Sequence, residues 1–192
     1  MISAIVLAAG ISKRMGEPKM LMPWGKSTVL QTVISTLQAS SVNDIIVVTG
    51  GARQQVETLV GKTVQTIFNA EYEKSEMLCS IQLGLSVKMH EASAALICLG
   101  DQPQIKERTV RSICEAFLKN KSQIVVPSYE MQRGHPWLVV RPLWDELLEM
   151  KPPHTPREFL KKHARKIQYV IVDTPSIIED LDTPEDYLKH KP

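Results

Sequence analysis

A loop near the N-terminus carries the residue types that hold a chain of phosphates. An apolar run, Ile2 to Val6, leads into the segment Leu7-Ala8-Ala9-Gly10-Ile11-Ser12-Lys13-Arg14-Met15-Gly16-Glu17-Pro18-Lys19. Glycine adopts a positive φ without a Cβ clash, so Gly10 and Gly16 allow successive backbone N–H groups to turn inward around an anion. The cationic side chains of the same loop can neutralise phosphate oxygens. The loop therefore predicts a triphosphate site at the end of a buried strand.

The spacing of this loop differs from two common phosphate-binding motifs. A Walker loop requires G-x-x-x-x-G-K-[ST], but Gly16 is followed by Glu17. A dinucleotide fingerprint requires G-x-G-x-x-G, but no second glycine follows Gly10 until Gly16. An anion site of another kind is expected.

Two acidic segments offer oxygen ligands for a metal ion. Gly100-Asp101-Gln102-Pro103 follows an apolar run, and Asp180-Leu181-Asp182-Thr183-Pro184-Glu185-Asp186 lies near the end of the chain. Magnesium prefers an octahedral shell of oxygens and usually takes one or two protein carboxylates beside substrate phosphates. Asp101 is the leading candidate, Asp182 the second, and Asp180 is less favoured. Each also has an ordinary role open to it, since aspartate suits turns and helix N-caps.

The elements that must position these residues follow from the hydrophobic pattern. Short β-rich runs alternate with segments of helical period, which predicts an α/β fold with a mostly parallel sheet and helices on both faces. The expected strands are 2–7, 44–49, 63–68, 94–99, 123–126 and 167–172. The expected helices are 28–39, 53–60, 75–89, 109–118 and 184–190, with Ser75 as an N-cap and Asp182 or Thr183 as the N-cap of the last helix. Residues 129–140 are expected as an irregular or hairpin insertion and 151–156 as a surface loop.

Parallel strands bring these loops to one edge of the sheet. Ligands of open α/β sheets bind at the carboxyl ends of the strands, where the strand order reverses. Gly10 and Asp101 each follow a predicted buried strand. We therefore expect both to face one cleft.

Composition sets broad limits on the class of protein. The 192 residues predict a single domain, 1–192. With 23 basic and 21 acidic residues the net charge is +2, which gives no broad field for nucleic acid or an anionic membrane. No apolar stretch approaches the ~20 residues that span a bilayer, so a cytoplasmic protein is expected. Cys79, Cys98 and Cys114 form no C-x-x-C pair and are expected as buried free thiols.

The motifs described above, taken together, resemble those of a known family. The pattern L-A-A-G-x-S-x-R-M-G-x-x-K is similar to the signature loop of the nucleotidyltransferases that build the dinucleotide form of the molybdenum cofactor, above all the molybdenum cofactor cytidylyltransferases. Three further segments match in the family's order: 100–103, Arg133-Gly134-His135-Pro136, and 180–186. The resemblance implies a Rossmann-like, three-layer nucleotidyltransferase fold that uses Mg²⁺, CTP and molybdopterin or the molybdenum cofactor.

The resemblance also implies roles for individual residues. Lys19, Arg14 and Asp101 form the catalytic set, with Lys19 at the α-phosphate, and Asp101 and Asp182 hold the metal. The alternative for the two cations is that they are solvated loop residues. The residues expected to bind the nucleotide are Leu7, Ala8, Ala9, Gly10, Ser12, Arg14, Gly16, Lys19, Ser80 and Gly100.

Two further segments are compared with the family. Residues 75–80 are similar to the segment that closes over the nucleotide, although Leu78 and Cys79 stand where the family favours small residues. Arg133, Gly134 and His135 match the element beside the second substrate and offer a cation and an imidazole to an anionic pterin phosphate.

Base selection is inferred from one methyl group. Cytidylyltransferases of the resembling families tend to carry L-A-A-G and guanylyltransferases L-A-G-G, and this chain has Ala9 at that position. The interpretation is therefore transfer of CMP from CTP to molybdopterin, whose product would serve a molybdenum hydroxylase through a transient complex with its apoenzyme. The alternatives are a guanylyltransferase, a sugar- or alcohol-phosphate nucleotidyltransferase of the same fold, and a non-catalytic carrier of the cofactor.

Overall fold

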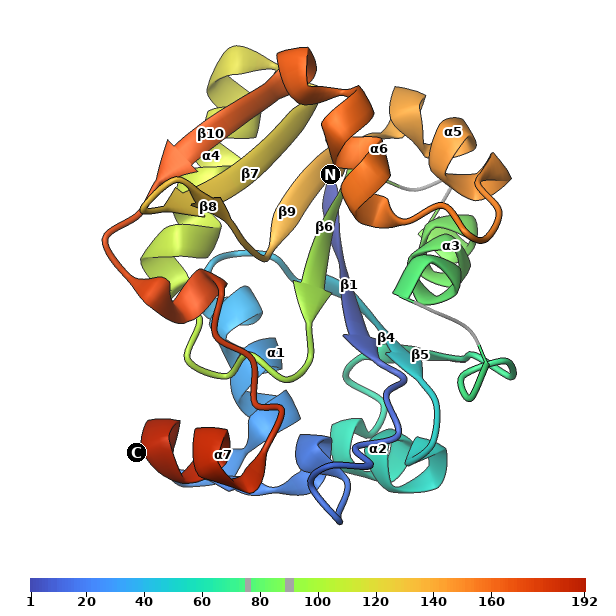
Figure 1. The fold of residues 1–192 in the computed structure, drawn as a ribbon, viewed down its shortest axis with the longest axis vertical. Coiled ribbons are helices and arrows are strands. Elements are labelled where there is room, and N and C mark those ends of the chain that lie inside the picture. The colour runs from blue at the N-terminus through green and yellow to red at the C-terminus, as the bar shows by residue number, and fades with distance from the viewer. Residues whose placement is uncertain (75–76, 89–91) are drawn as a thin grey trace.

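The computed structural model describes residues 1–74, 77–88 and 92–192 (Figure 1). Its strands are β1 (Ile2–Ala8), β2 (Pro23–Trp24), β3 (Ser27–Thr28), β4 (Asp44–Thr49), β5 (Gln65–Phe68), β6 (Ala94–Leu99), β7 (Ile124–Tyr129), β8 (Gln132–Arg133), β9 (Trp137–Val140) and β10 (Ile167–Ile171). Its α-helices are α1 (Val29–Ala39), α2 (Arg53–Val60), α3 (Met77–Lys88), α4 (Glu107–Asn120), α5 (Trp144–Glu149), α6 (Pro156–Lys162) and α7 (Pro184–His190). Short 3-10 helices include η1 (Lys19–Leu21) and η4 (Pro175–Ile177).

One mixed, mostly parallel sheet forms the centre of the molecule. The strands lie in the order β10-β7-β9-β6-β1-β4-β5, and β8 pairs with the end of β7. β1 is parallel to both β4 and β6, whereas β9 is antiparallel to β6 and β7. The order reverses around β1, whose neighbours β4 and β6 come later in the chain. The carboxyl ends of β1, β4, β5 and β6 therefore meet at one edge of the sheet.

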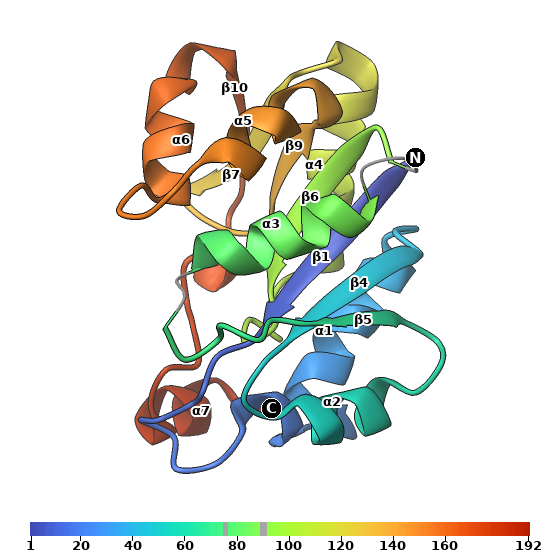
Figure 2. The ribbon, with the colours of Figure 1, turned by 90° about the vertical axis from the view of Figure 1, so that its right-hand side faces the viewer.

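Side chains that point alternately to the two faces of the sheet divide the hydrophobic core into two layers. In β1, Ala4, Val6 and Ala8 pack on the side of α1, α2 and α4, while Ile5 and Leu7 pack on the side of α3, α5 and α6. Successive strand side chains point to opposite faces, so a strand buried on both faces is apolar throughout. Figure 2 shows α3 lying across one face of the sheet with α1 and α4 behind it. The expected three-layer α/β fold is confirmed.

A small third cluster fixes the C-terminal segment beside the N-terminal loop. Met15, Met22, Trp24, Val29, Leu181 and Tyr187 form it. The Tyr187 hydroxyl donates to the Pro23 carbonyl at 2.6 Å, and its ring lies 6.2 Å from that of Trp24. Figure 1 shows α7 below the carboxyl ends of the strands, next to this loop. The end of the chain is thus held near its beginning.

The sequence patterns predicted the long elements better than the short ones. The strands at 44–49 and 94–99 and the helices at 53–60 and 184–190 have the predicted bounds. The prediction of an irregular or hairpin insertion at 129–140 was only partly right, because β9 is a buried inner strand of the sheet. α5 and α6 were not predicted, since six and seven residues give fewer than two helical turns of periodicity. Ser75 and Met89 lie outside the described residues.

The cysteine prediction was right for two of three residues. All three cysteines are free thiols, and Cys98 and Cys114 are buried. Cys79 is only half-buried. Burial raises the pKa of Cys98 well above its ordinary value, and that of Cys114 to about 11, so both are neutral thiols at physiological pH.

Candidate active site

A cavity of about 300 Å³ opens at the carboxyl ends of the central strands. It is reached by residues that follow β1, β5 and β6, by the first turn of α3, and by the segment before α7. Its lining residues are Leu7, Ala9, Gly10, Lys19, Met20, Asn69, Tyr72, Met77, Ser80, Leu99, Asp101, Asp180 and Asp182. The expectation that Gly10 and Asp101 face one cleft is confirmed.

Charged side chains form one cluster at this cavity. The Lys19 ammonium lies 2.5 Å from an Asp101 oxygen and 3.1 Å from an Asp182 oxygen. Arg14 pairs with the other Asp182 oxygen at 2.8 Å. The Lys19 and Asp101 side chains are 11% and 17% exposed, whereas that of Arg14 is 67% exposed. Two cations and two carboxylates from three widely separated parts of the chain therefore share one site.

The cluster fixes the charge state of its members. Burial alone would lower the pKa of Lys19, but the charges and hydrogen bonds of Asp101 and Asp182 outweigh it and raise that pKa above its ordinary value. Burial alone would raise the pKa of Asp182, but Lys19 and Arg14 outweigh it and lower that pKa. The lysine is a cation and Asp182 a carboxylate at neutral pH.

The glycine loop delivers Lys19 into the cavity. Ser12 and Gly16 adopt positive φ values of 54° and 75°, and the Met15 N–H donates to the Ser12 carbonyl at 2.9 Å. The Ser12 hydroxyl accepts from the Lys19 N–H at 3.2 Å. Pro18 then precedes the short helix η1, whose first residue is Lys19. Ser12 and Gly16 thus shape the loop and do not line the cavity.

Asp182 reaches the site because Thr183 takes the capping role. Thr183 is the N-cap of α7, with Asp186 completing a capping box. The Leu181 N–H donates to the Asp101 carbonyl at 3.3 Å, which joins the two acidic segments. Asp182 is therefore available to the cavity, and the alternative that it caps the helix is wrong.

Asp180 also lines the cavity, although the sequence favoured it less. It accepts a hydrogen bond of 2.7 Å from the buried Gln102 side chain. Burial, together with the negative charge of Asp101, raises the pKa of Asp180. Gln102 also donates to the Ile177 carbonyl at 3.4 Å, so it ties the segment after β6 to η4.

The carboxylates fit a divalent metal ion that takes most of its ligands from outside the protein. In the described residues, no group of three or more His, Cys, Asp or Glu side chains is placed to hold a metal alone. Asp101 and Asp182 nevertheless converge on the same cation, the Lys19 ammonium, which shows that their oxygens can share a positive charge. Magnesium needs only one or two protein carboxylates when phosphates and waters complete its shell. The donor set is therefore suitable for a substrate-bound metal.

A second group of residues that line the cavity is uncharged. It consists of Asn69, Tyr72, Met77 and Ser80. Asn69 and Ser80 are 2% and 5% exposed and hydrogen-bonded to each other at 3.1 Å. Sequence reasoning named Ser80 and missed Asn69. The position of Asn69 directly after β5 was the signal that could have found it.

Arg133, Gly134 and His135 lie beside the cavity wall rather than on it. The His135 N–H donates at 2.9 Å to the Ile177 carbonyl, the same carbonyl that Gln102 contacts. A Cβ on Gly134 would meet that carbonyl oxygen at 2.1 Å, so only glycine fits. Arg133 is exposed and stacks over Tyr169, 5.4 Å from the ring centroid. Burial, aided by the charge of Arg157, lowers the pKa of His135 to about 4, so the imidazole is neutral at pH 7.

The predicted nucleotide-binding residues divide into lining and supporting groups. Those that line the cavity are Leu7, Ala9, Gly10, Lys19 and Ser80. The Ala8 side chain packs in the opposite layer of the core, which leaves only its backbone for the predicted contact with a nucleotide. Gly100 supports the loop, because its N–H donates to the Leu7 carbonyl at 3.0 Å. Arg14 stands at the rim through its pair with Asp182.

The turn after β4 constrains the glycine loop through one close backbone approach. A Cβ on Gly50 would lie 2.2 Å from the Ala9 carbonyl oxygen, so the two turns pack backbone against backbone. We expect Gly50→Ala to lower the free energy of unfolding by about 1–3 kcal/mol, the usual cost of overpacking. Urea denaturation measures it. Gly10→Ala is the matched control, because its Cβ would meet nothing within 4 Å. Equal stability of the two variants would contradict the close approach.

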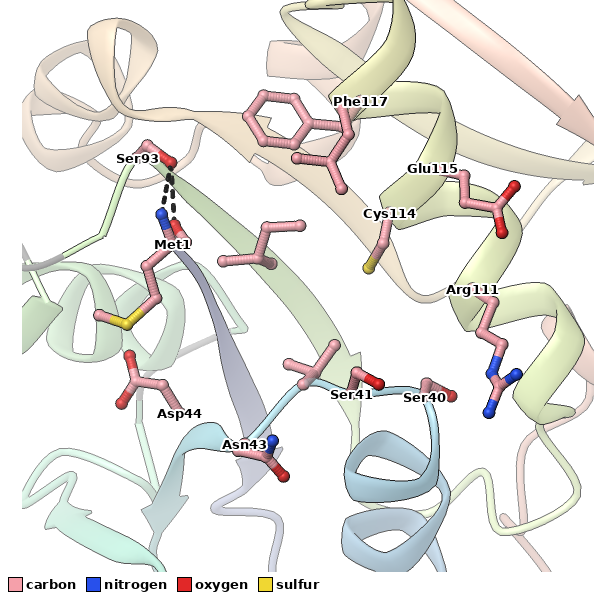
Figure 3. Close-up of a pocket in the computed structure, with 13 residues that line it drawn as sticks. Met1, Ser40, Ser41, Asn43, Asp44, Ser93, Arg111, Cys114, Glu115 and Phe117 are labelled. Carbon is pink, nitrogen blue, oxygen red and sulfur yellow. Dashed lines mark hydrogen bonds between the residues drawn. The ribbon is translucent and has the colours of Figure 1, made fainter.

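A larger cavity, about 670 Å³, lies at the opposite edge of the sheet. Figure 3 shows it between the beginnings of β1, β4 and β6 and helix α4, with Met1, Asp44, Ser93 and Arg111 around it. None of the predicted site residues lines this cavity. The charged cluster and the glycine loop belong to the smaller one, which we take as the candidate active site.

A doubly wound sheet, a glycine loop after its first strand, and carboxylates at the same edge define an α/β nucleotidyltransferase. Residues 4–167 match the family model of the MobA-like NTP transferase domain. The chain belongs to this family.

Two curated relatives match over the full chain. A molybdenum cofactor cytidylyltransferase of Escherichia coli is 30% identical over 193 residues, which cover 99% of this chain and 95% of the relative. A nicotine blue oxidoreductase of Paenarthrobacter nicotinovorans is 24% identical over 191 residues, which cover 96% and 93%. This chain is therefore similar to proteins named for different activities.

Solved structures confirm the fold. Rv0371c from Mycobacterium tuberculosis is 26% identical and matches with a TM-score of 0.85, covering 98% of this chain and 96% of that one. A complex of the same protein with manganese is 25% identical and matches with a TM-score of 0.79 over the same shares of both chains. In the part of this chain that the structure describes, no helix is long and apolar enough to cross a membrane.

Proposed function

We propose that this nucleotidyltransferase transfers CMP from CTP to the terminal phosphate of molybdopterin or its molybdenum complex, releasing pyrophosphate. The observation that carries the proposal is the Lys19 ammonium held between Asp101 and Asp182 in the cavity. The 30% identity to a molybdenum cofactor cytidylyltransferase over nearly all of both chains supports this choice of substrates.

Nucleotidyl transfer brings two anions together, so positioning and charge neutralisation are the chief tasks. In the proposed site, the triphosphate lies along the glycine loop between Gly10 and Gly16. Lys19, displaced from its carboxylates by the incoming ligand, neutralises the charge that develops at the α-phosphate. Arg14, which is exposed at the rim, contacts the outer phosphates. A phosphate oxygen of the acceptor attacks phosphorus, and pyrophosphate leaves.

Asp101 and Asp182 are proposed to hold a divalent metal that is bound with the triphosphate. When bound, Mg²⁺ would act as a Lewis acid on the phosphoryl oxygens. The hard oxygen donors fit this ion, and the manganese complex of the similar Rv0371c supports a divalent metal in this fold. Asp180, whose oxygen accepts from Gln102, is proposed to support the segment rather than to bind the metal.

The acceptor is proposed to approach from the side of Arg133 and His135. The exposed Arg133 supplies a cation for the pterin phosphate, and the neutral imidazole of His135 supplies a hydrogen-bonding group. The Ile177 carbonyl joins this loop to Gln102, directly after Asp101. The supply of the product to a molybdenum hydroxylase through a transient complex remains part of the proposal.

A non-catalytic cofactor carrier is the competing proposal from another class. A carrier needs neither a lysine at the α-phosphate nor a pair of metal-binding carboxylates, yet all three groups meet in one cavity. Release of pyrophosphate from CTP only when molybdopterin is present would distinguish the enzyme from the carrier.

We expect Ala9→Gly to relax the preference for CTP over GTP without reversing it. Ala9 lines the cavity, and a methyl-sized change in a pocket changes discrimination by about 10–200-fold at most. The measurement is the ratio of kcat/KM for the two nucleotides with molybdopterin as acceptor. An unchanged ratio in the variant would place base selection elsewhere, in the Gly50 to Arg53 backbone or near Ser80. A wild-type preference for GTP would overturn the cytidylyltransferase proposal itself.

A further inference from the structure

Two polar side chains among the uncharged residues that line the cavity have hydrogen-bonding roles fixed by their neighbours. Asn69 follows β5, and Ser80 lies in the first turn of α3. The Asn69 Oδ1 accepts from the backbone N–H of Glu71 at 3.0 Å. A backbone N–H can only donate, so the amide oxygen must face Glu71 and the amide NH₂ must face Ser80. The orientation of the Asn69 amide is thus determined by chemistry.

The Asn69 orientation in turn decides the role of Ser80. The Asn69 Nδ2 lies 3.1 Å from Ser80 Oγ, and because it is a donor, the hydroxyl oxygen accepts. A hydroxyl has one proton to donate in addition to its two lone pairs. Within residues 1–74, 77–88 and 92–192, no group accepts the Ser80 proton. Since Ser80 lines the cavity, that proton is available to a bound ligand.

The ligand atom that meets this proton belongs to the uncharged part of a nucleotide. Lys19, Asp101 and Asp182 form a separate cluster in the same cavity, which suits phosphates and metal. Tyr72 and Met77, which line the cavity together with Ser80, offer an aromatic ring and a thioether, which suit the flat face of a base. The edges of nucleobases carry lone-pair acceptors, such as the ring N3 and O2 of cytosine.

We propose that Asn69 is a positioning residue that forces the Ser80 hydroxyl to donate a hydrogen bond to an acceptor atom on the nucleobase. This inference rests on the proposed nucleotide site and assigns the contact with the base to the Ser80 hydroxyl. Ser80 contacts the base, and Asn69 acts through Ser80.

A double-mutant cycle on nucleotide binding tests this role. The ligand is CTP with Mg²⁺ and no acceptor, titrated by calorimetry. Ser80→Ala removes the donor. Asn69→Asp keeps the shape and still accepts from Glu71, but it turns the Ser80 proton toward its own carboxylate. We expect each variant to bind CTP about tenfold more weakly, which corresponds to ~1.4 kcal/mol and lies within the usual net contribution of a hydrogen bond.

The double variant shows whether Asn69 acts on binding through Ser80 or independently of it. If Asn69 acts through Ser80, the Asn69→Asp/Ser80→Ala protein should bind CTP at most about threefold more weakly than Ser80→Ala does. That small further loss of affinity would come from the added negative charge. Asn69→Leu, which frees the hydroxyl to rotate, should bind more tightly than Asn69→Asp although it removes more hydrogen bonds. Asn120→Asp is the control, because Asn120 donates to Gln168 on the exposed surface.

Two results would overturn the inference. One is wild-type affinity in Ser80→Ala, which is informative even if the Asn69 variants do not fold. The other is multiplication of the two single losses to about a hundredfold in the double variant. Failure of the proposed function has a different signature, since the wild-type protein would then bind no nucleoside triphosphate in the same titration. If the wild type binds GTP and not CTP, the cycle is measured with GTP.

Discussion

Asp101→Asn is expected to lower metal-supported turnover by roughly 10²-fold or more while leaving the fold intact. Asparagine keeps the shape of the side chain and can still accept a hydrogen bond from Lys19, which lies 2.5 Å from the Asp101 carboxylate. It loses the negative charge that a hard cation requires. The measurement is the rate of pyrophosphate release as a function of Mg²⁺ concentration, with CTP and molybdopterin saturating.

A matched control is available on the surface. Asp173 is exposed and paired with Arg108, far in sequence from the acidic segments, so Asp173→Asn should retain the wild-type rate. Thermal unfolding of both variants checks that the fold is kept. Full activity of a folded Asp101→Asn protein would refute the assignment of Asp101 as a metal ligand.

Lys19→Ala is expected to cost about 10²–10³ in turnover, the usual loss when a preorganised group at developing charge is removed. The variant also leaves Asp101 without its cation. Asp182 keeps its pair with Arg14, and the cavity gives solvent and metal access to Asp101, so we expect the protein to fold. Turnover should therefore fall much further than stability.

Lys26→Ala separates this effect from a general loss of positive charge. Lys26 is an exposed cation in the hairpin between β2 and β3. Removing an exposed charge changes little. If Lys19→Ala were as active as Lys26→Ala, Lys19 would have to be regarded as a structural ion-pair partner only.

The sequence predicted the positions of the main groups better than their contacts. Gly10, Asp101 and Lys19 could be placed at one edge because parallel strands end together. The apolar runs that become β1, β4 and β6 are buried on both faces and are therefore easy to recognise.

The contacts that complete the site come from tertiary packing. The approach of Asp182 to Lys19 depends on the cluster of Trp24, Leu181 and Tyr187, whose members are widely separated in sequence. No local pattern encodes that docking. The capping role of Thr183 was one of two alternatives, and only the structure distinguishes it from a capping role of Asp182.

Side-chain direction is the other feature that the motif alone does not determine. Ala8 belongs to the same motif as Ala9, yet the period-2 alternation of β1 turns Ala8 into the core. Asn69 was missed because a single polar residue after a short strand resembles an ordinary turn residue. Its importance follows only from the orientation that Glu71 imposes on its amide.

Pyrophosphate release from CTP, GTP, ATP and UTP, each with and without molybdopterin and in the presence of Mg²⁺, tests whether this protein is a cytidylyltransferase. We expect release from CTP that depends on molybdopterin and on the metal, and slower release from the other nucleotides. Binding of molybdopterin with no pyrophosphate released from any nucleotide would contradict it and favour a carrier.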